Sequence, residues 1–293
     1  MACIAIVGVG AIGGALAGLL ETAGRHELTL CTRRPIEALT VHTPQGVVQV
    51  KAQNVTDPTA APAVDWVIVA TKTYDSEGAA KWFPALCANG ARVAVVQNGV
   101  EHRERFAPWV RSDRLLPVVI DCPTERRPDG TVMVRGDTLM KVEDNQLGQE
   151  FTRLFAASPA KILLVDDFTS AAWWKLCINS VGALCAITLQ PDRVLWGEAM
   201  TCIAMEMVAE CVRVARAEGA QLDDTMPDQV MALCRAHPAD SVNSLLADRL
   251  AGRPMETDAR NGAIVRKGET HGIPTPMNRM AVALLQAMEN SAL

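Results

Sequence analysis

The N-terminal sequence CIAIVGVGAIGG places a short apolar run, Cys3–Val7, directly before a glycine loop and a long helix of small and apolar residues. In such a loop Gly8 permits a tight turn, Gly10 lets the main chain approach a pyrophosphate, and Gly13 lets helix and strand pack closely. The helix N-terminus then offers free N–H groups and a positive dipole end to the phosphates. Strand, glycine loop and helix in this order predict a dinucleotide-binding domain, and a glycine-rich turn without ligand is the alternative. The predicted cofactor contacts are Gly8, Gly10, Ala11, Ile12 and Gly13.

The second predicted strand, HELTLC, ends without the Asp or Glu that usually binds the adenosine ribose in NAD-dependent domains. Thr32, Arg33 and Arg34 follow instead. A guanidinium group suits a ribose 2′-phosphate, which a carboxylate would repel. The sequence therefore predicts NADP(H) as the cofactor, with Thr32 as an additional hydroxyl donor. The spacing does not choose between Arg33 and Arg34, and a pair of solvated loop arginines is the alternative.

Two later segments, residues 65–73 and 91–100, begin as continuous apolar runs, as expected for parallel strands covered on both faces. Both end in polar residues, and ligands of open α/β sheets bind beyond the carboxyl ends of the strands. Lys72 is therefore predicted near the adenosine end of the cofactor, and Asn98 near the nicotinamide and the substrate. Loop chemistry is the alternative for both, because Asn98-Gly99 is also a favourable turn pair.

From Arg114 onward, short strand-like runs separated by turn residues are expected to extend the sheet, partly in antiparallel. Placing the boundary after Asp167 gives a Rossmann-type dinucleotide-binding domain at residues 1–167 and an all-helical substrate domain at residues 168–293. The fold class is then α/β, with the active site expected in the cleft between the two domains. Helices are expected at residues 169–188, 198–218, 226–236, 241–250, 254–272 and from Pro276 onward.

The apolar segment AWWKLCINSVGALCA contains one lysine, Lys175, and one asparagine, Asn179. At about 100° per residue, these two share a helix stripe with Ala183, flanked by small residues. One ammonium group, one amide and free space are typical of a cleft wall that a small ligand approaches. A lysine that extends to solvent is the alternative, and the adjacent tryptophans are more simply core.

Two further candidates lie in the later helices. Glu256 is expected in the first turn of the helix that starts near Pro254, where an acidic residue also stabilises the helix dipole without any catalytic role. Ser244 is a candidate polar contact, and a plain helix cap is its alternative.

The composition excludes several classes of protein. The net charge of −5 argues against a nucleic-acid partner. The nine cysteines lack metal-ligand spacing and lie mostly in apolar runs, so we expect buried thiols, no metal site and a cytoplasmic location. We also expect no signal peptide, no membrane partner and no apolar stretch long enough to span a bilayer.

Taken together, IVGVGAIGG, the arginines after the second strand, ATKTY, VVQNGV, WWKLCINS and NSLLADRLAGRPMETDARNG resemble the ketopantoate reductase (2-dehydropantoate 2-reductase) family over nearly the whole chain. The resemblance implies NADPH-dependent reduction of a 2-keto acid, ketopantoate, to a 2-hydroxy acid in pantothenate biosynthesis. It implies Lys175 as general acid and Glu256 as its acidic partner. Asn98, Asn179 and Ser244 would hold substrate or nicotinamide. Lys72 and an arginine near Arg33 would meet the phosphate of NADP.

Two departures bear on the substrate. Relatives commonly carry a second asparagine where this chain has Ala183, and a later polar contact is replaced around residues 189–192. Loss of an amide from a pocket changes discrimination between substrates. A dehydrogenase for a different 2-keto or hydroxy acid is therefore one alternative, and a non-catalytic NADP(H) sensor is another. The oligomeric state, including a homodimer, stays open.

Overall fold

A computed structural model describes residues 1–290 of the chain and divides them into two units. The first comprises residues 1–97 and 102–168, and the second comprises residues 98–101 and those from 169 onward. The chain thus enters the second unit for four residues, returns to the first, and later continues into the second. The sequence did not indicate this early excursion.

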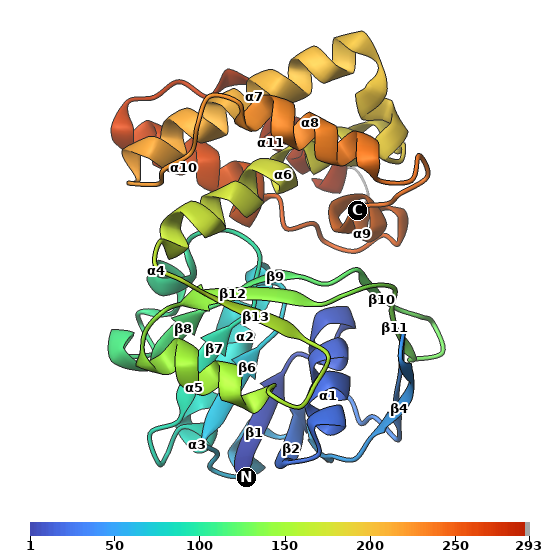
Figure 1. Cartoon of the computed structure of the whole chain (residues 1–293), viewed down its shortest axis with the longest axis vertical. Helices are drawn as coiled ribbons and strands as arrows, with labels where there is room; N and C mark the ends of the chain where they lie inside the picture. The colour runs from blue at the N-terminus through green and yellow to red at the C-terminus, as the bar shows by residue number, and fades with distance from the viewer. Residues whose placement is uncertain (291–293) are drawn as a thin grey trace. The chain divides into compact units, whose positions relative to one another are not determined.

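Six parallel strands form the main sheet of the first unit, in the order β5-β2-β1-β6-β7-β8 (Figure 1). The strand order reverses between β1 and β6, and the glycine loop follows β1 at this switch point, where ligands of such sheets bind. This sheet confirms the parallel arrangement predicted from the apolar runs. The strands are β1 (Ala2–Val7), β2 (His26–Cys31), β5 (Gln53–Val55), β6 (Trp66–Val69), β7 (Arg92–Val95) and β8 (Leu115–Pro117).

Successive residues of the central strands face two separate hydrophobic clusters, because side chains alternate along a strand. Ile4 and Ile6 of β1 pack on the side of helices α1 and α5, whereas Ala5 and Val7 pack on the side of α2, α3 and α4. Burial on both faces explains why these strands are apolar throughout. The helices are α1 (Ala11–Ala23), α2 (Ser76–Ala80), α3 (Phe83–Leu86), α4 (His102–Phe106) and α5 (Gln146–Leu154).

The expectation that all later strands extend the main sheet is wrong, because only β8 does so. The others form two further sheets, of order β10-β11-β3-β4 and β13-β12-β9. These strands have only three to five residues, so their pairing depends on tertiary partners and not on local pattern. Their bounds are β3 (Leu39–Thr43), β4 (Gly46–Val50), β9 (Val119–Asp121), β10 (Thr124–Arg126), β11 (Val132–Val134), β12 (Leu139–Glu143) and β13 (Lys161–Val165).

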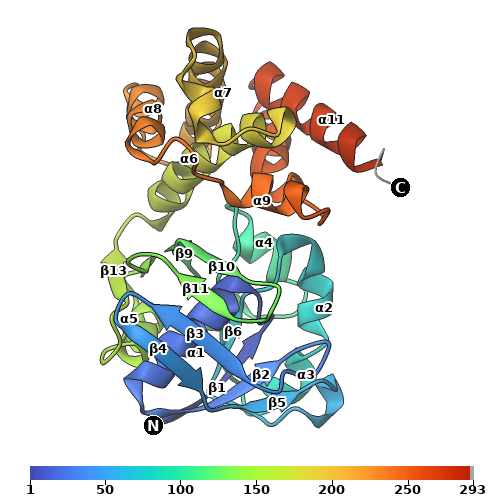
Figure 2. The same ribbon diagram turned by 90° about the vertical axis from the view of Figure 1, so that its right-hand side faces the viewer.

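The four-stranded sheet covers α1 on the side away from the main sheet (Figure 2). Two helix glycines permit this approach. A Cβ atom on Gly14 would lie 2.6 Å from a methyl carbon of Val132, and one on Gly18 would lie 2.9 Å from a methyl carbon of Val41. The small residues on α1 thus let the helix lie closely between two sheets, which fixes the helix that the glycine loop opens.

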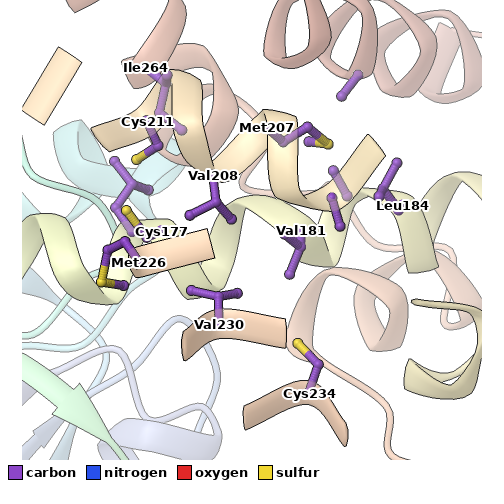
Figure 3. Packing of buried hydrophobic residues seen from close by; sticks show 14 of the residues in the cluster. Cys177, Val181, Leu184, Met207, Val208, Cys211, Met226, Val230, Cys234 and Ile264 are labelled. Atoms are coloured by element: carbon purple, nitrogen blue, oxygen red, sulfur yellow. The ribbon is translucent and has the colours of Figure 1, made fainter. Parts of the chain in front are cut away.

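The second unit is helical, as predicted, and α6 lies in its core. Figure 3 shows Cys177, Val181 and Leu184 of α6 among side chains from α7 and α8, all buried. The predicted bounds of the helices agree with the structure within three residues, apart from the segment after Pro254. The helices are α6 (Phe168–Thr188), α7 (Glu198–Ala217), α8 (Met226–Ala236), α9 (Ser244–Leu250), α10 (Ala263–His271) and α11 (Pro276–Asn290).

Helix α6 corrects one further expectation, because by length and composition it is apolar enough to cross a bilayer. Its apolar window is 61% buried within the protein, however. A core helix of a soluble protein meets the same criterion, so the helix is weak evidence for a membrane span.

Candidate active site

The glycine loop after β1 has the shape that a pyrophosphate site requires. Gly8 has a φ of +91°, and a Cβ atom on Gly13 would lie 2.0 Å from the Gly8 carbonyl oxygen, so the fold itself demands both glycines. A Cβ atom on Gly10 would meet nothing within 4 Å. The first turn of α1, which begins with Ala11 and Ile12, has no acidic residue and no capping side chain. Its N–H groups therefore suit an anion beside Gly10.

The loop after β2 presents two exposed arginines, Arg33 and Arg34, and its single carboxylate, Glu37, comes three residues after them. The Arg33 side chain is 90% exposed, with the carboxylate of Asp75 4.0 Å away. The Thr32 hydroxyl donates to the Arg34 carbonyl oxygen at 2.7 Å and accepts from Asn54 Nδ2 at 2.8 Å. Thr32 therefore shapes the loop that carries both guanidinium groups.

Gln97 joins the loops that follow β6 and β7. Its buried amide donates to the Thr71 hydroxyl at 3.1 Å and to the Lys72 carbonyl oxygen at 3.3 Å. Lys72 itself is half-buried and precedes a short 3-10 helix. Arg126 of β10 donates to the Val9 carbonyl oxygen and thereby braces the glycine loop. These contacts fix the carboxyl ends of three neighbouring strands.

Asn98 belongs to the second unit, where its excursion segment is held at three points. Asn98 Nδ2 donates to Glu256 Oε2 at 3.0 Å. Gly99 has a φ of +96°, and its close approach to the Ala259 carbonyl would place a Cβ atom only 2.5 Å from that oxygen. Glu101 forms an ion pair with Arg266 of α10 at 2.7 Å. The fold therefore needs glycine at position 99 to bring Asn98 to Glu256.

Helix α6 contributes the third member of this polar chain. Asn179 Nδ2 donates to Asn98 Oδ1 at 3.4 Å, a long hydrogen bond, and Asn98 donates onward to Glu256. Lys175 is half-buried one turn before Asn179, as the stripe predicted. The structure thus brings together Asn98, Asn179 and Glu256, with Lys175 on the same helix face as Asn179.

Glu256 precedes its helix, so its predicted place in a first turn is wrong. The Met255 N–H donates to the Glu289 side chain at 2.7 Å, which ties this stretch to α11. A π-helical turn, Asp258–Gly262, then leads into α10, and such turns are frequent at functional sites. Buried Asn261 ties this turn to α6 by donating to the Ser180 carbonyl oxygen at 3.0 Å. Glu256 itself is 4% exposed, unlike the typical solvated acid at a helix end.

Ser244 is not the cap of its helix. Asn243 caps α9 by accepting from the Leu245 and Leu246 N–H groups. The Ser244 hydroxyl instead accepts from Arg260 Nη2 at 2.5 Å. Ser244 therefore joins the polar group that follows Glu256.

Comparison with known proteins places this arrangement in one family. Residues 4–146 match the family "Ketopantoate reductase PanE/ApbA", and residues 167–289 match "Ketopantoate reductase PanE/ApbA C terminal". The chain belongs to the ketopantoate reductase family. It is 46% identical over 287 residues to 2-dehydropantoate 2-reductase of Caulobacter vibrioides. The aligned region covers 98% of this chain and 99% of that protein.

A second ketopantoate reductase relative, the 2-dehydropantoate 2-reductase of Mycobacterium tuberculosis, is 36% identical, with 97% of each chain covered. The crystal structure of the PanE/ApbA family ketopantoate reductase of Ralstonia eutropha is 33% identical, with a TM-score of 0.91 and 99% of each chain covered. Membership in this family makes the chain a dinucleotide-binding oxidoreductase that acts on a ketone or the corresponding alcohol.

Ala183 does not lie on an accessible cleft wall, where the stripe with Lys175 and Asn179 had placed it. It is fully buried in the helical core. In the preceding position, a Cβ atom on Gly182 would lie 3.1 Å from Asn243 Oδ1, so the start of α9 packs against this turn of α6. A second asparagine at position 183 would therefore have to fit inside the buried core of this unit.

Arg260 and Gln97 are the polar residues of this family member that sequence reasoning missed. Arg260 follows Glu256 by four residues, a spacing that usually marks an exposed ion pair on a helix. Its burial depends on the π-helical turn and was not visible in the pattern. No group of three or more potential metal ligands occurs among residues 1–290.

Proposed function

We propose that this protein reduces 2-dehydropantoate (ketopantoate) to pantoate with NADPH, in a cytoplasmic biosynthetic role. The observation that supports this most is the chain of hydrogen bonds from Asn179 through Asn98 to the buried Glu256. Asn179 starts this chain on the same face of α6 that carries Lys175. A reductase needs a proton donor and orienting amides around a ketone, whereas a sensor of NADP(H) needs neither.

The first unit would hold the cofactor. Gly8, Gly10 and Gly13, with the N–H groups of Ala11 and Ile12, would bind the pyrophosphate. Arg33 or Arg34 and Lys72 would bind the 2′-phosphate, with Thr32 shaping their loop. When bound, NADPH supplies the hydride.

Lys175 would donate a proton from Nζ to the ketone oxygen as negative charge develops there. Asn98 and Asn179 would orient the substrate and hold the Glu256 carboxylate in one position. Glu256 would in turn orient Lys175 or bind the substrate hydroxyl, and Ser244 would add a hydroxyl contact.

The test follows nicotinamide absorbance with ketopantoate and a panel of other 2-keto acids. Lys175→Ala should lower kcat by about 10²- to 10⁴-fold, which is the usual contribution of a positioned general acid. Lys267→Ala is the matched control, because Lys267 is a partly buried lysine of the same unit that pairs with Glu218 at 2.9 Å. Equal activity of the Lys175 and Lys267 variants would remove Lys175 from the mechanism.

Two other outcomes address substrate and cofactor. Reduction of a different 2-keto acid, but not of ketopantoate, would replace the proposed substrate. Tight NADPH binding without turnover of any keto acid would favour the sensor. A wild-type preference for NADH over NADPH would refute the role of Arg33 and Arg34.

A further inference from the structure

Buried polar atoms without hydrogen-bond partners gather on one stretch of the second unit. Among residues 1–290, six buried side-chain nitrogen or oxygen atoms have no partner. Four of them lie between positions 243 and 261, namely Asn243 Nδ2, Thr257 Oγ1, Arg260 Nε and Asn261 Oδ1. Such atoms normally find a partner, since leaving one unpaired is costly. Thr257 and Arg260 follow Glu256 within four positions, and the charge of Glu256 acts on Arg260, so these unpaired atoms point to a ligand with polar groups of its own.

Among these four residues, Arg260 is the one with a charged side chain. The residue is 2% exposed, yet its guanidinium group remains charged. Its Nη2 atom donates to the Ser244 hydroxyl oxygen, and its Nε atom donates to nothing. Accepting that bond leaves the hydroxyl hydrogen of Ser244 as a donor. Arg260 Nε is therefore a buried donor without an acceptor, and the exposed Ser244 hydroxyl is a second donor beside the same guanidinium group.

The carboxylates near Arg260 leave its Nε atom without a hydrogen bond. Burial lowers the pKa of Arg260, and the negative charges of Glu256 and Asp248 act in the opposite direction. Glu256 accepts from Asn98, however, and Asp248 accepts from Arg253 Nε at 3.0 Å. A buried cation is stabilised only when a well-placed anion or acceptor meets its donors.

We propose that Arg260 selects substrates that carry a carboxylate. Its Nε–H and Nη2–H edge binds the carboxylate of the 2-keto acid in the forked geometry that a guanidinium group provides, and the Ser244 hydroxyl adds a third hydrogen bond. This inference rests on the proposed function, since it assigns the acid group of the same substrate. It makes Arg260 a specificity-determining residue that discriminates 2-keto acids from neutral ketones.

The experiment compares ketopantoate with its uncharged cyclic ester, ketopantolactone, at saturating NADPH. Arg260→Gln should lower kcat/KM for the acid by about 30- to 1,000-fold, mainly through KM, because truncating one partner of a buried charge pair has an effect of this size. The value for the lactone should change less than about threefold. Arg260→Lys keeps the charge but not the fork, and should fall between wild type and Arg260→Gln.

Arg249→Gln is the control for a merely structural arginine. Arg249 Nη1 donates to the main-chain carbonyl oxygens of Ala186 and Ile187, so its loss should affect acid and lactone equally. An equal loss for both substrates in Arg260→Gln, or no loss for either, would overturn the inference. So would a hydrogen bond from Nε to an ordered water in a crystal structure with substrate bound.

Titration of the NADP⁺ complex with pantoate, the 2-hydroxy acid, separates failure of the inference from failure of the proposed function. If the wild type reduces no ketopantoate, the proposed function fails. Tighter binding of pantoate by the wild type than by Arg260→Gln still supports the carboxylate site. Equal binding, or binding by neither protein, overturns it.

Discussion

Gly10 and Gly13 of the same loop are expected to have different roles, and substituting each of them with alanine can distinguish these roles. In Gly13→Ala, the new Cβ atom would lie 2.0 Å from the Gly8 carbonyl oxygen, well inside the 3.4 Å at which ordinary contact begins. In Gly10→Ala, the new atom would meet nothing within 4 Å, and the φ of −84° at this position lies outside the left-handed region that favours glycine. One substitution therefore strains the fold, and the other only fills the space expected for the pyrophosphate.

The magnitudes follow from these contacts. The main-chain shift that Gly13→Ala requires costs about 3 kcal/mol, and the gain in helix propensity returns about 1 kcal/mol. The net loss of about 2 kcal/mol should lower the Tm of the apoprotein by about 4 to 8 °C for a unit of this size. Gly10→Ala loses a little stability because alanine is a poorer N-cap residue than glycine, and gains a little because the unfolded chain has less conformational entropy. These two effects oppose each other, so the Tm should change by less than about 2 °C.

Thermal unfolding followed by circular dichroism, with and without NADPH, measures both effects. Gly10→Ala should weaken NADPH binding at least about tenfold by calorimetry, which corresponds to about 1.4 kcal/mol, and should reduce the stabilisation of the protein by the cofactor. Unchanged NADPH affinity in Gly10→Ala, or an apoprotein Tm lowered as far as in Gly13→Ala, would refute the assignment of separate roles to the two glycines.

Three further outcomes concern stability and reactivity. Burial lowers the pKa of His102 from 6.5 to about 4. The contribution of neutral His102 to the free energy of unfolding should therefore be fully present above pH 6.5 and should fall by about 3 kcal/mol as the pH drops toward 4. His102→Gln should flatten this part of a plot of urea midpoint against pH. Buried Glu210 accepts two main-chain N–H groups at the start of α11. Glu210→Ala should cost about 2 to 4 kcal/mol in urea unfolding, against less than about 1 kcal/mol for exposed Glu206→Ala. Burial raises the pKa of the Cys31 thiol to about 12, whereas Cys202 is exposed. Cys202→Ser should therefore abolish the fastest phase of labelling by a thiol reagent, and an unchanged fast phase would contradict this.

The features that local sequence could predict are those set by neighbouring residues. The glycine loop, the apolar central strands and the helices α6, α7 and α8 all follow from signals within a few turns of chain. Gly8 and Gly13 proved necessary for reasons of space that the motif anticipates. The family resemblance implied active-site roles for both Asn98 and Glu256, but nothing in the sequence predicted their hydrogen bond, since 158 positions separate them.

The missed features are those that tertiary partners decide. The three-residue strands β10 and β11 join a separate sheet that packs against α1. No pattern within these strands predicts that packing. The helix expected from Pro254 begins only at Ala263, after a π-helical turn, and the segment before this turn is tied to Glu289, 34 positions after Met255. The burial of Arg260 likewise depends on a π-helical turn that propensity does not predict.

Departures from ordinary folding rules concentrate where the proposed chemistry lies. Within one stretch of the second unit, the chain has a π-helical turn, a buried carboxylate and a buried guanidinium group with an unpaired Nε. Gly99, with its positive φ, packs on the same turn. Elsewhere in this unit, α6, α7 and α8 bury a largely apolar core, and the buried carboxylate of Glu210 accepts two main-chain N–H groups of α11. Each departure costs stability, so selection for folding alone would remove them. Their persistence on the turn that holds Glu256 and Arg260 is the expected mark of a site shaped for an anionic ligand rather than for the stability of the free protein.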